Sequence, residues 1–370
     1  MHSTQKVKLL YITNGIKDPA GLERVLSVKA SYLADELNYE VHILTLNNNG
    51  AIPFYTFSKN IIHHDVAVGG NPFRYIKSYV SGIKVAVKQI QPDIILVCDD
   101  GLKGFFLPLM VDKPCPMIYE RHVSKVVELG ENPSLLKKII VGAKFFLMRQ
   151  LGKTFDQFVV LTEDNRKEWP MTNVVVISNP LSFYPNESSA LSNKKVIAVG
   201  KHSLQKGYDR LLQSWVEVQR DFPDWQLEIY GKIDLKYQFE ELSKSLNINE
   251  TVTFFPPVAD IQSKYLASSI FVLSSRFEGF GMVLIEAMAC GVPCVTFDCP
   301  YGPADIVAHQ QDGLVVKNND ITAFALAIKD LIEKENLRIA FGKAAKQNVK
   351  RFLPEVILPQ WDALFKRYIS

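Results

Sequence analysis

Hydrophobic residues in this chain gather into short runs, and between the runs apolar residues recur every three to four positions. A short apolar run bounded by turn residues is typical of a buried strand, and the longer period is typical of an amphipathic helix. The first half opens with a strand expected at 7–13, a helix at 22–38 and a strand at 40–46. Further strands are expected at 93–98, 116–119, 158–162 and 174–178. This alternation predicts a parallel sheet covered by helices.

The alternation starts afresh after the Asn179-Pro180 turn and the polar stretch 184–195, where we place the linker between two domains. Strands are expected at 196–199, 226–230, 251–255, 270–274 and 293–297, and helices at 208–220, 236–246, 261–267 and 282–290. Helical patterns continue through 321–335 and 337–352, and the final segment 354–368 is apolar enough to pack on another element. The second half therefore predicts another doubly wound α/β domain.

Composition agrees with two globular domains. A chain of 370 residues, 47% of them hydrophobic, exceeds what one core usually serves. Lys plus Arg number 42 against 39 for Asp plus Glu, so the charge favours neither nucleic acid nor another strongly charged partner. Any electrostatic preference must therefore be local.

Cysteine usage and hydropathy suggest a reducing compartment. The five cysteines are an odd number without a disulfide framework, and the group at 290, 294 and 299 has no histidine at zinc-ligand spacing. We expect ordinary core cysteines and no metal site. The first six residues contain no apolar signal segment, and no apolar run reaches the roughly 18 residues of a spanning helix. We therefore expect a cytoplasmic protein.

The segment 277–295, with the sequence FEGFGMVLIEAMACGVPCV, carries the clearest candidate chemistry. Glycines at 279 and 281 allow the backbone to approach a ligand closely. A helix beginning near Met282 presents free N–H groups that favour an anion. This arrangement suits a diphosphate.

Two glutamates flank that glycine-rich turn. Glu278 precedes the helix and can hydrogen-bond sugar hydroxyls, although a carboxylate here can also serve as a helix cap. Glu286 lies two turns further on and can accept both hydroxyls of a ribose. A carboxylate in such an apolar helix needs a ligand or a partner, so an internal salt bridge is the alternative for Glu286.

The segment 277–295 resembles the E-x7-E signature of retaining glycosyltransferases of family 4, which have the two-domain GT-B fold. The segment 199–209 is similar to the strand-loop-helix of that family whose basic residues hold the donor diphosphate. The segment 20–24 resembles its first glycine loop, and 302–314 resembles its downstream stretch. The resemblance implies an α/β chain of GT-B architecture, with two Rossmann-like doubly wound parallel-sheet domains facing a central cleft.

The turn at Asn179-Pro180 gives the boundary between the domains, and the resemblance implies the role of each domain. Residues 1–180 are expected to form the N-terminal, acceptor-side domain, and 181–354 the C-terminal domain that binds the nucleotide sugar. The last helix, 355–370, is expected to pack back on the first domain.

The resemblance also implies a donor site. Its expected residues are Gly21, Lys201, Lys206, Glu278, Phe280, Gly281, Met282, Val283 and Glu286. Glu278 and Lys206 are the expected catalytic pair, because a departing diphosphate must be stabilised as its charge develops. The family commonly has arginine at position 201. Lys201 therefore offers the point charge of an ammonium where a guanidinium would bind the diphosphate with two hydrogen bonds. Cations can act here without a metal, and no cofactor is expected beyond the nucleotide sugar.

Retention of anomeric configuration is implied by the resemblance alone. The second carboxylate is expected to bind ribose, which leaves one carboxylate beside the sugar. We therefore favour a front-face displacement in which the leaving diphosphate accepts the acceptor's proton.

The sequence indicates fewer residues for the acceptor site than for the donor site. Glu120, Arg121 and His122 end an expected strand, near where the family places a polar group facing the donor sugar. His122 is equally compatible with a surface loop, and Glu120 and Arg121 with a local ion pair.

The segment 136–153 combines aliphatic and aromatic residues with five cations and no acid. This composition suits contact with anionic lipid at the inner face of a membrane. The alternative is a helix packed on the first domain with its lysines reaching outward. Membrane contact would favour a lipid-linked saccharide acceptor.

Together these features predict a metal-independent retaining transferase in cell-surface polysaccharide or glycolipid synthesis. It would move a hexose or N-acetylhexosamine from a nucleotide sugar, with UDP favoured, to a saccharide or lipid-linked saccharide. The alternatives are an epimerase of free sugar nucleotides, a GDP-mannose-dependent mannosyltransferase and a non-catalytic binding subunit. A nicotinamide dehydrogenase is disfavoured because the first loop has no G-x-G-x-x-G.

Overall fold

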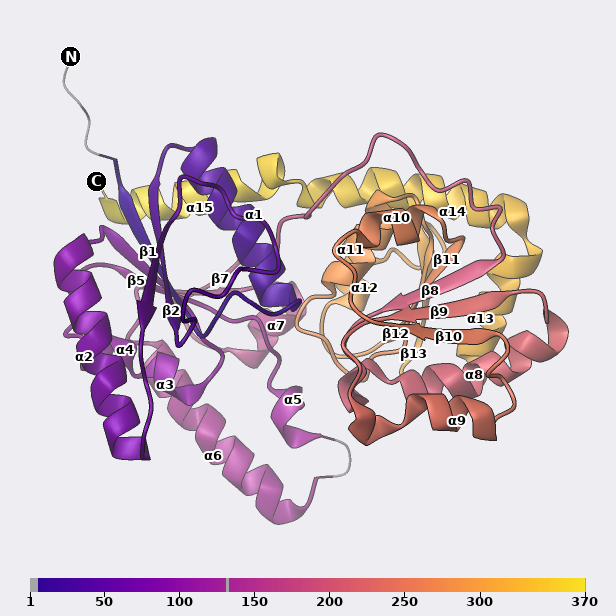
Figure 1. Ribbon diagram of the computed structural model, residues 1–370, viewed down its shortest axis with the longest axis horizontal. Helices are drawn as coiled ribbons and strands as arrows, with labels where there is room; N and C mark the ends of the chain where they lie inside the picture. Colours follow the sequence, from indigo (N-terminus) through magenta and orange to yellow (C-terminus); the bar gives the residue numbers. More distant parts are fainter. Residues whose placement is uncertain (1–5, 131–132, 370) are drawn as a thin grey trace. The chain divides into compact units, whose positions relative to one another are not determined.

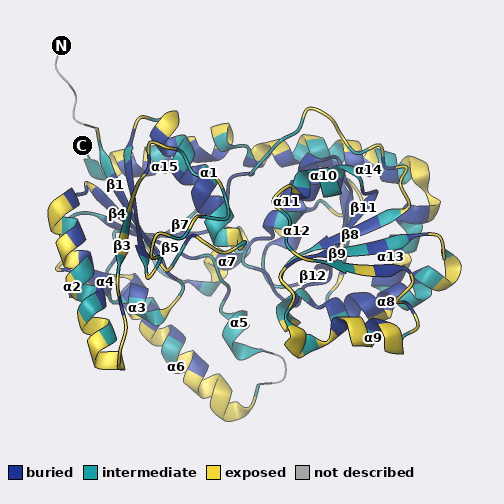
Figure 2. Ribbon diagram, in the orientation of Figure 1, coloured by how far each residue is buried: buried dark blue, intermediate teal, exposed yellow. Residues whose placement is uncertain are grey.

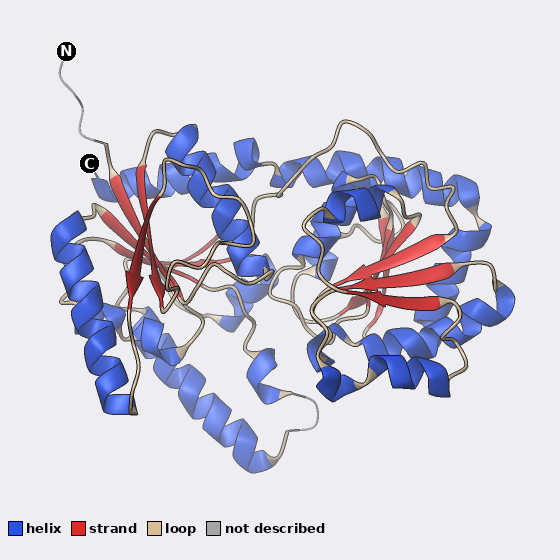
Figure 3. Ribbon diagram, in the orientation of Figure 1, coloured by secondary structure: helices blue, strands red, loops and turns tan. Residues whose placement is uncertain are grey.

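The computed structural model describes residues 6–130 and 133–369. The chain divides into two compact units. One unit reaches to Pro180 and also takes in the chain from Pro354 onwards, and the other is Leu181–Leu353. Each unit contains a parallel sheet between layers of helices (Figures 1 and 3).

The first unit contains a 7-stranded sheet in the order β3-β2-β1-β4-β5-β6-β7. Its strands are β1 Lys8–Thr13, β2 Glu40–Leu46, β3 Ile62–Val66, β4 Ile94–Cys98, β5 Met117–Glu120, β6 Gln157–Val160 and β7 Val174–Val176. Its helices are α1 Gly21–Asp35, α2 Pro72–Ile90, α3 Leu102–Phe105, α4 Leu107–Met110, α5 Val126–Leu129, α6 Leu135–Gly152, α7 Glu163–Glu168 and α15 Pro354–Ile369. Every residue of β4 is buried, as expected of a central strand covered on both faces.

The second unit contains a 6-stranded sheet in the order β10-β9-β8-β11-β12-β13. Its strands are β8 Lys195–Val199, β9 Gln226–Tyr230, β10 Val252–Phe255, β11 Ile270–Leu273, β12 Cys294–Asp298 and β13 Gly313–Lys317. The helical segments are η1 Leu204–Lys206, α8 Tyr208–Asp221, η2 Leu235–Tyr237, α9 Phe239–Ser245, α10 Ile261–Leu266, α11 Met282–Ala289, α12 Pro303–Ile306, α13 Ile321–Glu333, α14 Glu335–Asn348 and η3 Val349–Phe352. In both sheets the strand order reverses beside the first strand of the unit, which creates a switch point there.

The edge strands β3 and β13 are not among the strands expected from the sequence. Each lies at the edge of its sheet, and β3 has the sequence IHHDV with none of its residues buried. A strand that is not covered on both faces does not produce the continuous apolar run from which inner strands are predicted. The helix expected at 236–246 is also interrupted, because Gln238 has a left-handed φ of 45° between η2 and α9.

Helix α15 belongs to the first unit and packs against α1. Its residues Trp361 and Phe365 are buried, and the Tyr39 hydroxyl donates a 2.7 Å hydrogen bond to Asp362. The stretch 184–195, in contrast, lies inside the second unit and is not a free linker.

Cysteines in the described residues carry free thiols, and all but Cys115 are buried. Across residues 6–130 and 133–369, no helix combines the length and the apolar character required to cross a bilayer.

Candidate functional site

In the second unit, the loops after β8 and β11 bring Lys206 and Glu278 together. These two strands are neighbours at the switch point of the sheet, where ligands of open α/β sheets usually bind. The Lys206 Nζ lies 2.7 Å from Glu278 Oε1, and the two side chains are only 16% and 7% exposed. Two of the expected site residues, 72 positions apart, therefore form a largely buried ion pair.

The loop that carries Lys206 is held against the end of β11 by its backbone. Gly207 has a φ of 63°, and a Cβ at this position would lie 2.2 Å from the carbonyl oxygen of Ser274. The Ser274 hydroxyl donates to the carbonyl of Lys206 at 2.8 Å, and the Arg276 amide donates to the carbonyl of Gln205 at 2.8 Å. Only glycine permits this close approach without a shift of the backbone.

Arg276 also connects the loop after β11 to the first turn of α8. Its guanidinium donates two hydrogen bonds of 2.7 Å to Asp209 and one of 2.9 Å to the carbonyl of Leu204. Burial alone would raise the pKa of Asp209, but the hydrogen bonds and charge of Arg276 lower it. Arg276 is not among the site residues expected from the sequence, although it stands two positions before Glu278.

Glu278 is held by its neighbours and does not cap the following helix. Its Oε1 accepts a 2.5 Å hydrogen bond from the Ser275 hydroxyl, and its amide donates to the Pro300 carbonyl at 2.7 Å. The N-cap of α11 is Gly281, with a φ of 104° and no side-chain cap. The capping alternative for Glu278 is therefore wrong.

The start of α11 is enclosed by the backbone that follows β12. Gly302 has a φ of 114°, and a Cβ there would lie 2.1 Å from the carbonyl oxygen of Phe280. The Phe280 ring is buried edge-on against Phe352, with 5.6 Å between ring centroids. Phe280 thus supports the loop from within the core, and the first amides of α11, those of Met282 and Val283, lie at the helix end that favours an anion.

Glu286 lies on α11 and is only 3% exposed. Its Oε1 accepts a hydrogen bond of 2.9 Å from the Ser182 hydroxyl, and its Oε2 accepts one of 3.3 Å from the Tyr265 hydroxyl. Neither partner is basic, and nothing in the local sequence pointed to them. Carboxylate oxygens held by hydroxyl donors are suited to exchange them for the hydroxyls of a ribose.

Lys201 and the adjacent His202 point to different surroundings. The Lys201 side chain is 58% exposed, and its Nζ lies 3.8 Å from Asp234. His202 is buried, and its Nε2 has no hydrogen-bond partner among the described residues. The rings of Tyr208 and Phe254 face it edge-on, and burial lowers its pKa to about 4.

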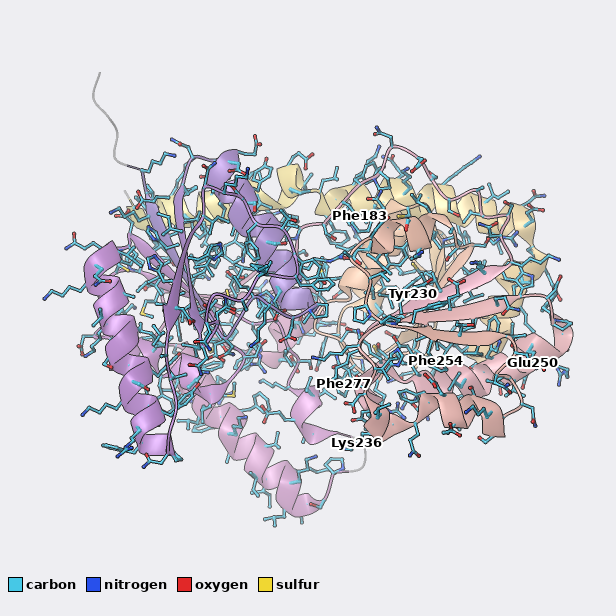
Figure 4. All side chains as sticks on the ribbon, viewed as in Figure 1. Phe183, Tyr230, Lys236, Glu250, Phe254 and Phe277 are labelled. Atoms are coloured by element: carbon cyan, nitrogen blue, oxygen red, sulfur yellow. The ribbon has the colours of Figure 1, made fainter. Side chains whose placement is uncertain are left out.

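Aromatic residues also line the carboxyl ends of β9 and β10, which are neighbouring strands (Figure 4). Tyr230 stacks on Phe255 with 4.6 Å between ring centroids, and the Tyr230 hydroxyl donates to Glu228. This aromatic pair is not among the site residues expected from the sequence.

In the first unit, Gly21 begins α1 directly after the first loop, and the space where a Cβ would stand is open. Glu120 ends β5 and is buried, with its Oε2 paired to the ammonium of Lys29. Arg121 donates to the Asp100 carbonyl at 2.8 Å. The alternative of a local ion pair between Glu120 and Arg121 is therefore wrong, because each of these residues has another partner.

His122 is not a surface-loop histidine. Its side chain is 7% exposed, and its Nε2 lies 3.3 Å from Glu120 Oε2. The ligand atoms of Cys98, Glu120 and His122 lie within 4.8 Å of one another, which is close enough for one metal ion to contact all three. The Lys29 ammonium already lies against the Glu120 carboxylate, and a second cation there would meet electrostatic repulsion.

Residues 185–348 match the family model described as glycosyl transferases group 1. Two relatives are each 29% identical to the chain: an uncharacterized glycosyltransferase of Haemophilus influenzae and the amylovoran biosynthesis glycosyltransferase AmsD of Erwinia amylovora. Both alignments cover 96% of this chain, with 99% of the first relative and 98% of the second. The protein is a glycosyltransferase.

Solved glycosyltransferases share the fold. Sucrose-phosphate synthase from Thermosynechococcus elongatus superposes with a TM-score of 0.81 at 18% identity, covering 98% of this chain and 99% of that one. Anabaena Alr3699/HepE, solved in complex with UDP and glucose, gives a TM-score of 0.78 at 17% identity, covering 97% and 99%. The expected GT-B architecture is confirmed.

Proposed function

We propose that this glycosyltransferase moves a hexose or N-acetylhexosamine from UDP to a saccharide or lipid-linked saccharide, with retention and without a metal ion. The Lys206–Glu278 ion pair carries this proposal, because it places an ammonium and a carboxylate at the switch point of the sheet, in the loops that lead to α8 and α11. The complex of HepE with UDP and glucose supports UDP as the nucleotide. The amylovoran relative supports polysaccharide synthesis as the setting.

Each residue has one role in the proposed reaction. The amides of Met282 and Val283 and the Lys206 ammonium stabilise the diphosphate as its bond to the anomeric carbon breaks. Glu278 then binds the hydroxyls of the donor sugar, and Glu286 binds the ribose. The acceptor oxygen forms its bond to the anomeric carbon on the face that the diphosphate leaves, and its proton passes to the diphosphate.

Donor binding must therefore rearrange the Lys206–Glu278 pair. While they face each other at 2.7 Å, each satisfies the charge of the other. A diphosphate carries more negative charge than one carboxylate, so it competes for Lys206 and releases an oxygen of Glu278 for the sugar. This exchange limits the cost of holding two charges in a largely buried site without ligand.

The proposal is tested with a panel of UDP- and GDP-sugars in the presence of saccharide acceptors and of EDTA. Lys206→Met should lower kcat by about 100-fold or more, the usual cost of losing one donor to a developing anion. Glu278→Gln should also lower kcat, because an amide group has one acceptor oxygen for the sugar hydroxyls where the carboxylate has two. Lys244→Met is the matched control, because Lys244 pairs with Glu241 at 2.8 Å on the exposed surface of the same unit. Unchanged turnover in either site variant, or donor breakdown that needs no acceptor, would contradict the proposal.

We also propose that α6 rests on an anionic membrane surface. One stripe of α6 packs on its unit, through Val141, Phe145, Met148, Leu151 and Gly152. Large apolar side chains on the remaining surface are 40% to 75% exposed: Leu135, Leu136, Ile139, Ile140, Phe146 and Leu147. Figure 2 shows this helix largely as exposed, and Figure 1 shows its first turns extending beyond the sheet of its own unit.

The cations of α6 lie between its two apolar surfaces. With 3.6 residues per turn, Lys138 and Arg149 follow one side of the buried stripe, and Lys144, towards its other side, pairs with Glu128 at 2.7 Å. The helix contains no acidic residue. An apolar surface flanked by cations is the pattern of helices that lie in the plane of an anionic bilayer.

Vesicle sedimentation tests this contact. The wild-type protein should bind vesicles of phosphatidylglycerol and phosphatidylcholine, and binding should weaken in high salt. Ile139→Ser with Phe146→Ser should abolish it, whereas Ile76→Ser with Val85→Ser should not, although these α2 residues are similarly exposed. A wild-type protein that stays in the supernatant would refute the proposal.

A further inference from the structure

A buried ion pair lies beneath His122 in the first unit. Lys29, from α1, and Glu120, at the end of β5, are 2% and 1% exposed and are 91 positions apart. The Lys29 Nζ also lies 4.2 Å from the ring centroid of Trp361 and 5.2 Å from that of Tyr11. Burying two charges contributes little net stability, so this pair calls for a role beyond holding the fold together.

The pair determines which hydrogen-bonding groups His122 presents. Burial acts to raise the pKa of Glu120, but the charge of Lys29 and the hydrogen bond with His122 lower it to about 2. Glu120 is therefore a carboxylate, which only accepts hydrogen bonds. The His122 Nε2, 3.3 Å from Glu120 Oε2, must carry the proton of that bond. In a neutral imidazole the Nδ1 is then an acceptor.

The surroundings of His122 restrict its position further. Its amide donates to Asp100 Oδ1 at 3.1 Å, and Asp100 is in turn paired with Arg121 at 3.4 Å. Glu23, in the first turn of α1, also interacts with His122: burial raises the pKa of Glu23, and His122 acts to lower it. Cys98, on β4, faces Glu120 as a thiol whose pKa burial and the Glu120 charge raise.

Among the described residues, no hydrogen bond is made to the Nδ1 of His122. We propose that Lys29 and Glu120 are positioning residues, which hold His122 as its Nε2–H tautomer and present Nδ1 to accept a hydrogen bond from a sugar hydroxyl. This role rests on the proposed glycosyl transfer. Lys29 fixes the carboxylate, the carboxylate fixes the imidazole, and the imidazole touches the substrate.

The tautomer of His122 can be determined by ¹⁵N NMR. Protein labelled with ¹⁵N-histidine is recorded at about pH 8.5, where an ordinary imidazole is neutral, and His122→Asn assigns the signals. The wild-type protein should show a protonated Nε2 and an unprotonated Nδ1. Glu120→Gln should populate both tautomers, because an amide can either donate or accept. An Nδ1–H tautomer in the wild-type protein, or no change in Glu120→Gln, would overturn the proposal.

Kinetics separate positioning from a purely structural role. Lys29→Met leaves a buried carboxylate unpaired and should lower Tm, whereas Lys29→Met with Glu120→Gln removes both charges and should recover most of the loss. If the pair only supports the fold, activity recovers together with Tm. If it positions His122, kcat stays about 10- to 100-fold low, as is usual when a supporting hydrogen bond is lost.

Lys84→Met is the matched control, because Lys84 pairs with Asp112 at 2.8 Å on the exposed surface of the same unit. It should leave both Tm and kcat unchanged. If the wild-type protein transfers no sugar from any nucleotide donor, the proposed function fails, and the tautomer measurement still decides the role of Lys29 and Glu120.

Discussion

The Arg276–Asp209 contact gives the sharpest prediction about the donor loops. Arg276→Met keeps a long apolar side chain at this position and removes the guanidinium. The substitution deletes two hydrogen bonds of 2.7 Å to Asp209 and one of 2.9 Å to the Leu204 carbonyl. Because these bonds join the loop after β11 to the loop that carries Lys206, the change tests both stability and function.

The expected magnitude follows from burial. Breaking a fully buried ion pair costs about 3–5 kcal/mol, largely because one charge remains without a partner. Arg276 is 8% exposed, but Asp209 is 30% exposed, so water can hydrate the freed carboxylate. We therefore expect a loss of about 2–3 kcal/mol in the free energy of unfolding of the second unit. For a unit of this size that loss corresponds to a fall in Tm of roughly 5–10 °C.

Urea unfolding of the wild type, Arg276→Met, Asp209→Asn and the double variant completes a double-mutant cycle. The coupling energy should be about 1.5–3 kcal/mol, because the charge-assisted hydrogen bonds between Arg276 and Asp209 are lost in either single variant. Transfer assays should show KM for the nucleotide sugar rising more in Arg276→Met than in the surface variant Lys244→Met.

A coupling energy near zero would refute the reasoning, because the two residues would then act independently. A stable Arg276→Met protein with an unchanged donor KM would also refute the assigned role of this contact in positioning Lys206.

Two further substitutions test the same region. Burial lowers the pKa of His202 to about 4, so as pH falls from about 6.5 the unfolded chain binds a proton that the folded protein does not. The stability of the wild-type protein should therefore decline between roughly pH 6.5 and 4, and urea midpoints should decline less for His202→Leu. Parallel pH profiles of the two proteins would contradict this prediction. Gly207→Ala places a Cβ 2.2 Å from the Ser274 carbonyl oxygen at a residue with a φ of 63°. It should lower the free energy of unfolding by more than about 1 kcal/mol and reduce sugar transfer. Gly142→Ala, where the space around a Cβ is open, should leave both Tm and turnover near wild type.

Much of the architecture could be predicted from local sequence alone. Inner strands such as β4, with the sequence IILVC, are buried on both faces and therefore appear as continuous apolar runs. The edge strand β3 is polar and partly exposed, and it was missed for the same reason. The glycines around Glu278 likewise indicated a turn where backbone approaches closely, because no other residue takes a φ of 104° without strain.

The sequence by itself determined where the buried strands lie and which residue types, above all Glu278, Glu286 and Lys206, are available for chemistry. Only the tertiary structure decided their partners. Lys206 meets Glu278 because β8 lies beside β11, and Lys29 meets Glu120 across 91 positions because α1 packs near the end of β5. Contacts of this kind depend on strand order and packing, and neither is encoded in the spacing of residues along one segment.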